Sequence, residues 1–96
     1  MAISKIPYNR LRTETYEIGM IENINAGGSK SVTENISLEG YSPLGIVQIS
    51  GTGVSNLSLV SFYIRDNTNA YVFYRNDTSS AKSNISVTAT ILYAKI

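Results

Sequence analysis

The feature that most constrains the fold is a strict alternation near the end of the chain, over residues 84–96. Apolar side chains occupy every second position there: Ile85, Val87, Ala89, Ile91 and Tyr93. The positions between them carry hydroxyl residues: Ser86, Thr88 and Thr90. A period of two places the two sets on opposite faces of a β-strand. The segment is therefore predicted to be a strand, paired in a terminal hairpin with the aromatic and β-branched segment 70–75 across the polar turn 76–83.

Turn residues divide the remaining chain into further strands. Gly, Pro, Asn and Asp cluster at residues 25–29, 40–43, 51–53 and 66–69. The segments between them predict strands at 15–24, 31–39, 44–50 and 56–65. Turns recur about every ten to fifteen residues, and no window has a helical period, as in a sandwich or barrel. We expect an all-β fold, an antiparallel, jelly-roll-like β-sandwich of about six strands over residues 15–96.

Residues 1–14 differ in kind from the rest. Their apolar residues follow no sustained period, and Pro7 disfavours helix at Ile6 and removes a ladder donor. An extended N-terminal arm over residues 1–14 is predicted, able to dock on a neighbouring protein. The alternative is an ordinary chain terminus resting on its own domain.

The middle strands carry more apolar residues than one small core needs. Residues 44–50 are apolar on both faces, which suits a central strand or a contact surface. In 56–65, Leu59 is out of phase with Val60 and Phe62, which predicts a β-bulge there or a second contact. The surplus predicts a homo-oligomer, with a trimer favoured, unless these side chains sit singly on the surface.

Composition argues against several functions. The chain has no Cys and no His, and its 8 basic and 7 acidic residues give a net charge of +1. Thiolate and imidazole chemistry is thereby excluded, and we expect no enzyme, no metal and no cofactor. No charge run selects nucleic acid, and no apolar run could span a membrane. Two close acid pairs, Glu14 with Glu17 and Glu34 with Glu39, are expected to be solvated surface residues.

One hairpin gathers aromatic and polar side chains that could bind a sugar. Aromatic faces beside Asp, Asn and Arg offer a platform for a sugar ring and partners for its hydroxyl groups. The candidate glycan-binding residues are Tyr63, Arg65, Asp66, Asn67, Asn69, Tyr71, Tyr74 and Arg75. The alternative is that the tyrosines are core or contact residues and the polar residues only form the turn.

Three ordered motifs carry a resemblance to a known class of domain. They are Gly-Tyr-Ser-Pro-Leu-Gly-Ile-Val at 40–47, Asn-Asp-Thr-Ser-Ser at 76–80 and Val-Thr-Ala-Thr-Ile-Leu-Tyr at 87–93. With them, residues 30–96 resemble the C-terminal β-domain of minor structural and tail-fibre proteins from bacteriophages of Gram-positive bacteria. The resemblance implies a virion protein made in the bacterial host cytoplasm, with tail-fibre, tail-accessory and capsid-decorating roles all open. It also implies contact with other virion proteins through the arm, and with host cell-wall polysaccharide if the module recognises a receptor.

Overall fold

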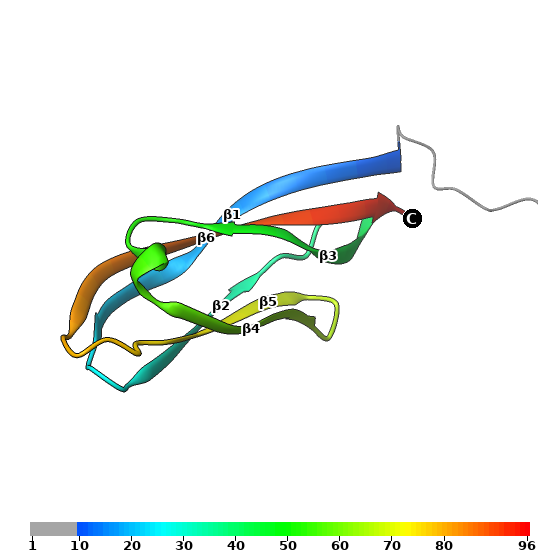
Figure 1. Ribbon diagram of the computed structural model, residues 1–96. Helices are drawn as coiled ribbons and strands as arrows, with labels where there is room; N and C mark the ends of the chain where they lie inside the picture. The colour runs from blue at the N-terminus through cyan, green and yellow to red at the C-terminus, as the bar shows by residue number, and fades with distance from the viewer. Residues whose placement is uncertain (1–9) are drawn as a thin grey trace, which may run out of the picture.

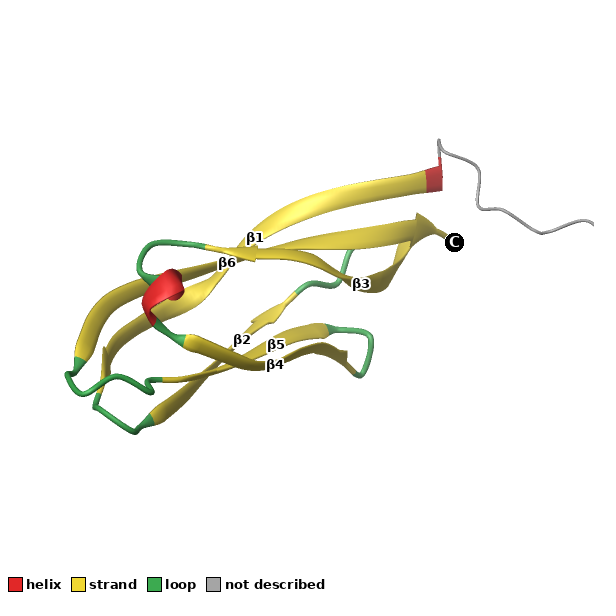
Figure 2. Cartoon of the chain, in the orientation of Figure 1, coloured by secondary structure: helices red, strands yellow, loops and turns green. Residues whose placement is uncertain are grey.

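The structure is a computed structural model that describes residues 10–96. The described chain is all-β, with six strands and one short 3-10 helix, η2 (Figures 1 and 2). The elements are β1 (Leu11–Ile24), β2 (Ser29–Asn35), β3 (Tyr41–Ser50), η2 (Val54–Asn56), β4 (Ser58–Arg65), β5 (Asn69–Arg75) and β6 (Lys82–Lys95). The all-β prediction is confirmed.

The strands form two antiparallel sheets of three strands each. Sheet A has the order β1-β6-β3 and sheet B the order β2-β5-β4. The two sheets lie as separate layers in Figure 1. Only β4 and β5 follow one another within a sheet among the described strands; every other connection passes from one sheet to the other.

The predicted terminal hairpin between 70–75 and 84–96 is wrong. β5 pairs with β2 and β4, whereas β6 pairs with β1 and β3 in the other sheet. Both strands have a fully apolar face, and two such faces can bury each other only across the interior, from opposite sheets. The connection between them therefore crosses between layers instead of closing a hairpin.

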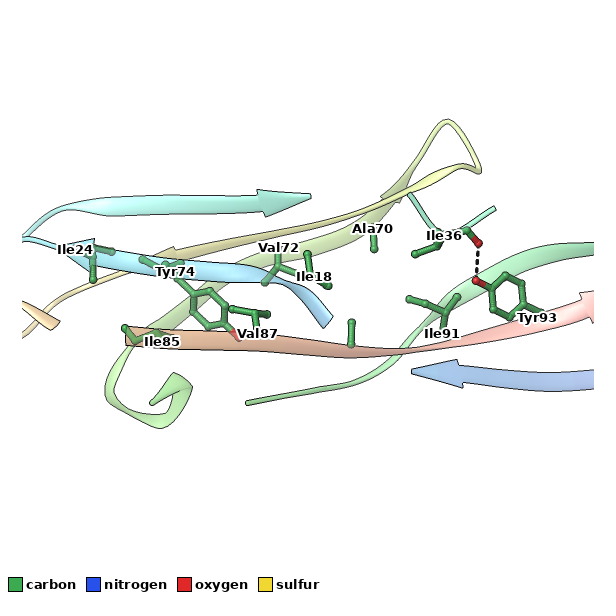
Figure 3. Close-up of a cluster of buried hydrophobic side chains, with 12 residues drawn as sticks. Ile18, Ile24, Ile36, Ala70, Val72, Tyr74, Ile85, Val87, Ile91 and Tyr93 are labelled. Carbon is green, nitrogen blue, oxygen red and sulfur yellow. Dashed lines mark hydrogen bonds between the residues drawn. The ribbon is translucent and has the colours of Figure 1, made fainter. Parts of the chain in front are cut away.

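The core lies between the sheets, and β6 supplies much of it. All five of its alternating apolar residues are buried, as the sequence predicts. Figure 3 shows Val87 and Ile85 of β6 facing Val72 and Tyr74 of β5 across the interior. The remaining buried apolar residues are Ile18, Ile21, Ile24, Ile36 and Ala70.

A buried tyrosine joins the two layers at the other end of the core. The hydroxyl of Tyr93, on β6, donates a hydrogen bond of 2.5 Å to the carbonyl of Ile36, just after β2 (Figure 3). A hydroxyl has one hydrogen, so in the 2.7 Å contact between the Tyr16 and Tyr93 hydroxyls Tyr16 is the donor. Burial, followed by this contact with Tyr16, raises the pKa of Tyr93.

The N-terminal boundary differs from the prediction. β1 begins at Leu11, and residues 11–14 pair in register with residues 91–94 of β6. The predicted arm is therefore wrong for these four residues, since their backbone completes the ladder along β6. Residues 1–9 of the predicted arm lie outside the described residues.

The start of β3 and the end of β2 also differ from the prediction. β3 begins at Tyr41, so Pro43 lies inside a strand. Sheet A places β3 at an edge, where a missing backbone donor can face away from the ladder. β2 ends at Asn35 instead of continuing to residue 39.

Candidate functional site

The hairpin predicted to bind a sugar is present, formed by β4 and β5. The amide of Thr68 donates to the carbonyl of Arg65 at 3.1 Å and closes the turn. Asp66 and Asn67 have φ of 56° and 57°, the left-handed values of a type I′ turn, which Asn and Asp tolerate. The turn signal at 66–69 is confirmed.

Three of the eight candidate residues meet on this hairpin. Tyr63 of β4 and Tyr71 of β5 are direct cross-strand partners, with ring centroids 5.0 Å apart. The Arg65 guanidinium lies 4.7 Å from the Tyr71 ring centroid and donates a 2.7 Å hydrogen bond to the Tyr63 hydroxyl. That hydrogen bond raises the pKa of Arg65 further above its ordinary value, so the group remains charged. We call these three residues the aromatic cluster.

Within the aromatic cluster, the Arg65 guanidinium already stacks on the Tyr71 ring. A sugar needs an open aromatic face, but the guanidinium of Arg65 occupies the face of Tyr71 in a cation–π contact. A glycan would first have to displace this contact, which is worth about 0.5–1 kcal/mol at an exposed site. The three side chains of the cluster therefore satisfy one another, and the Tyr71 ring face that a sugar would need is already covered by Arg65.

Of the other candidate residues, Tyr74 and Arg75 lie away from this cluster, whereas Asp66, Asn67 and Asn69 form the turn beside it. Tyr74 is 2% exposed and faces the core, where burial raises its pKa; it is wrong as a binding residue. Arg75 ends β5 at its far end from the turn and lies 4.0 Å from Asp77. Asn69 is half-buried and donates to the Thr68 hydroxyl at 3.1 Å. The prediction therefore mixed residues from both faces and both ends of β5.

A second surface stands out along the β4 edge of the hairpin. Nine large hydrophobic side chains are exposed in the described part of the chain, and six of them lie on β3 or β4. β3 is an edge of sheet A, β4 is an edge of sheet B, and the two edges contact each other. The six are Leu44, Val47, Leu59, Val60, Phe62 and Tyr63.

The two edges line two neighbouring hollows, which share Ile46 and Phe62. One, of about 360 Å³, is lined by Leu44 and Ile46 of β3 and by Phe62 and Ile64 of β4, among others. A second, of about 240 Å³, is lined by Val47 and Ile49 of β3 and by Leu59 and Phe62 of β4. Phe62 borders both hollows. We call four of the exposed lining residues, Leu44, Val47, Leu59 and Phe62, the edge patch; Tyr63 of the aromatic cluster borders the larger of the two hollows as well.

Bulges place apolar side chains along this open side. The register of β3 shifts twice against β6, leaving Leu44 and Val47 as the extra residues. The register of β4 shifts once against β5, leaving Val60 as the extra residue. The bulge predicted near Leu59 and Val60 is thus confirmed. An extra residue interrupts the regular hydrogen-bonding pattern of an edge strand and changes the direction in which the side chain of the bulged residue points.

The opposite side of the molecule is polar. A hollow of about 420 Å³ between β1 and β2 is lined by Glu22, Asn23, Lys30 and Ser31 together with three apolar residues. By contrast, the single charged residue within β3 and β4 is Arg65, at the end of β4. The exposed hydrophobic residues are thus concentrated on the side of β3 and β4, with six of the nine there.

Residues 10–96 contain no group of three side chains suited to hold a metal ion. Nor does this part of the chain contain a helix long and apolar enough to cross a membrane. In comparisons with known proteins, no protein-family model, no curated protein and no solved structure matches the chain.

Proposed function

We propose that the protein is a non-enzymatic structural component of a bacteriophage virion that assembles with copies of itself. The observation that carries this proposal is the concentration of exposed hydrophobic residues on two neighbouring edge strands. Six half-exposed side chains of this size present on the order of 500 Å² of apolar surface, in the upper part of the roughly 300–600 Å² of the largest patch on a typical monomer, which is often functional.

The strand order supports the virion part of the proposal. β1 pairs with β6 and β2 pairs with β5, both antiparallel, so in chain order the two pairs are nested around β3 and β4. This nesting supports a jelly-roll-like sandwich as the finer description of the fold, and jelly rolls are found in viral capsid and lectin domains. Fold alone does not define function, so the argument also uses the resemblance of residues 30–96 to phage minor structural domains. We favour a trimer, in a tail-accessory or capsid-decorating position.

Recognition of host cell-wall polysaccharide is the second candidate. It is supported by Tyr63 of the aromatic cluster, which is 43% exposed. It ranks below the structural role because Arg65 already covers Tyr71.

Two measurements test the proposed function. Sedimentation velocity at micromolar concentration should show a discrete oligomer, and mass spectrometry of purified particles from a phage that encodes the chain should detect the protein. A monomer at every concentration, or particles that lack the protein, would contradict the proposal. Binding of the oligomer to host cell-wall polysaccharide that is lost in Tyr63→Ala, with folding intact, would promote the second candidate.

A further inference from the structure

The interior of the domain is already closed without the edge patch. The apolar faces of β5 and β6 bury each other, and no buried side-chain polar atom among the described residues lacks a hydrogen-bond partner. The edge patch therefore does not complete the core of a single copy. Its exposed side chains need a separate explanation.

The charge distribution selects the kind of partner. β3 has no charged residue, and β4 has Arg65 alone, whereas β1 carries Arg12, Glu14, Glu17 and Glu22. A strongly charged partner would find nothing to pair with on the edge patch, and burying its charges there would be costly. A second copy presents the same uncharged surface and meets no like-charge repulsion.

The area of the surface also fits a second copy. The six exposed hydrophobic residues of β3 and β4, of which the edge patch is part, present about 500 Å² of apolar surface. With the polar rim around them, they approach the roughly 800 Å² that one partner contributes to a standard interface. A two-fold axis, or a higher rotation axis that the patch itself faces, buries the same patch on every copy.

The bulges determine how the copies can meet. Continuous β-sheet addition needs an uninterrupted row of backbone donors and acceptors on the edge strand. The extra residues Leu44, Val47 and Val60 interrupt that row on both edges. These extra residues are all large and aliphatic, so contact through side chains remains available where a shared ladder does not.

We infer that the edge patch is buried against the edge patch of a second copy of this chain, around a symmetry axis and through side chains. This inference rests on the proposed self-assembly and names its surface. It makes Val47 and Phe62 central to the contact, while Met20, on the polar side, stays outside it.

Charge substitution at two equally exposed positions tests the surface. Val47 is 56% exposed on β3, and Met20 is 57% exposed on β1. Val47→Lys should weaken self-association at least tenfold, measured by sedimentation equilibrium, because an ammonium group replaces a buried apolar group. Met20→Lys should change it less than twofold. Circular dichroism establishes that both variants remain folded.

Cross-linking provides a second test that does not depend on destabilising the contact. The chain has no cysteine, so one introduced thiol reacts alone. Val47→Cys, treated with a short bismaleimide, should yield a covalent dimer, whereas Met20→Cys should stay monomeric on a denaturing gel.

The outcomes separate the inference from the proposed function. An oligomer that Val47→Lys leaves intact, or that cross-links through Met20→Cys and not Val47→Cys, would overturn the inference and leave self-assembly standing. A wild-type chain that is monomeric at every concentration would overturn both.

Discussion

Asn76 is the side chain whose replacement should most clearly expose how the two sheets are joined. It is fully buried at the start of the connection from β5 to β6. Its Nδ2 donates to the carbonyl of Ile24 at 3.0 Å and to that of Ser80 at 2.9 Å. Its Oδ1 accepts from the amide of Thr78 at 3.1 Å and from its hydroxyl at 2.6 Å. The amide therefore ties the end of β1 to the crossing between layers.

Asn76→Ala should lower the free energy of unfolding by about 3–5 kcal/mol. The change removes all four hydrogen bonds and leaves the buried Ile24 carbonyl without this donor; each such bond is worth about 1 kcal/mol net, and a buried unpaired group costs about 1–3 kcal/mol. A domain of this size is stable by roughly 5–14 kcal/mol in total, so the loss is a large share of the whole.

Asn76→Asp keeps the shape but should destabilise in a pH-dependent way. A carboxylate would face two carbonyl oxygens where an amide now donates, so burial and these acceptors should raise the pKa of the new carboxyl when folded above its ordinary value of about 3.9. The deficit relative to wild type should then be smallest below about pH 4 and grow as the pH rises from there.

Urea unfolding followed by circular dichroism, at one fixed protein concentration, measures both variants. Asn23→Ala is the matched control, because Asn23 is exposed and its 3.3 Å bond to Asn25 joins two exposed side chains; it should cost under about 0.5 kcal/mol. A loss below about 1 kcal/mol for Asn76→Ala, or an Asp variant whose deficit does not change with pH, would refute the reasoning.

Two further substitutions probe the connection between layers and a close backbone contact. Tyr93→Phe should cost about 1–3 kcal/mol in urea unfolding by leaving the Ile36 carbonyl unpaired. Because the pKa of Tyr93 is raised in the folded state, wild type should lose stability as the pH rises above about 10, and this loss should shrink in Tyr93→Phe; equal alkaline profiles would contradict it. Gly51→Ala should destabilise the fold by about 2–3 kcal/mol, because the added Cβ would overlap the Ser86 carbonyl oxygen and because Gly51 has a φ of 136°. Gly45→Ala should be near neutral, because a Cβ added there would meet no atom within 4 Å. A thermal melt compares the two variants.

The sequence was sufficient for patterns that are local to a strand. Alternation predicted the buried face of β6, and a phase break predicted the bulge at Val60 in β4. Asp66 and Asn67 predicted the turn between β4 and β5, because those residues tolerate positive φ.

Pairing partners and face assignments needed the folded structure. In β5, Ala70, Val72 and Tyr74 face the core, but Tyr71 and Phe73 are equally apolar and face outward, so the sequence alone could not place Tyr74. Strand partners depend on which apolar faces meet across the interior, which is a non-local property. The same limit explains why β5 and β6 were predicted to form a hairpin.

The sequence showed the residues of the edge patch as a surplus of apolar side chains, but it could not predict that residues of β3 and β4 would lie next to each other. Leu44 and Phe62 border one hollow only because β3 and β4, in different sheets, are edges on the same side. The buried role of Asn76 was hidden because a turn-rich segment looks the same whether its amide faces solvent or the core.

The central position of β6 has a consequence for how the domain is made. The middle strand of sheet A is the last one synthesised, and β1 and β3 do not pair with each other without it. Until β6 has left the ribosome, the other two strands of that sheet have exposed apolar faces and no partner. Folding must then wait for a contact spanning almost the whole domain, between residues 11 and 94, which is typical of slow two-state folding. Translation products cut short before residue 82 should therefore be degraded or aggregate instead of accumulating as half-folded domains.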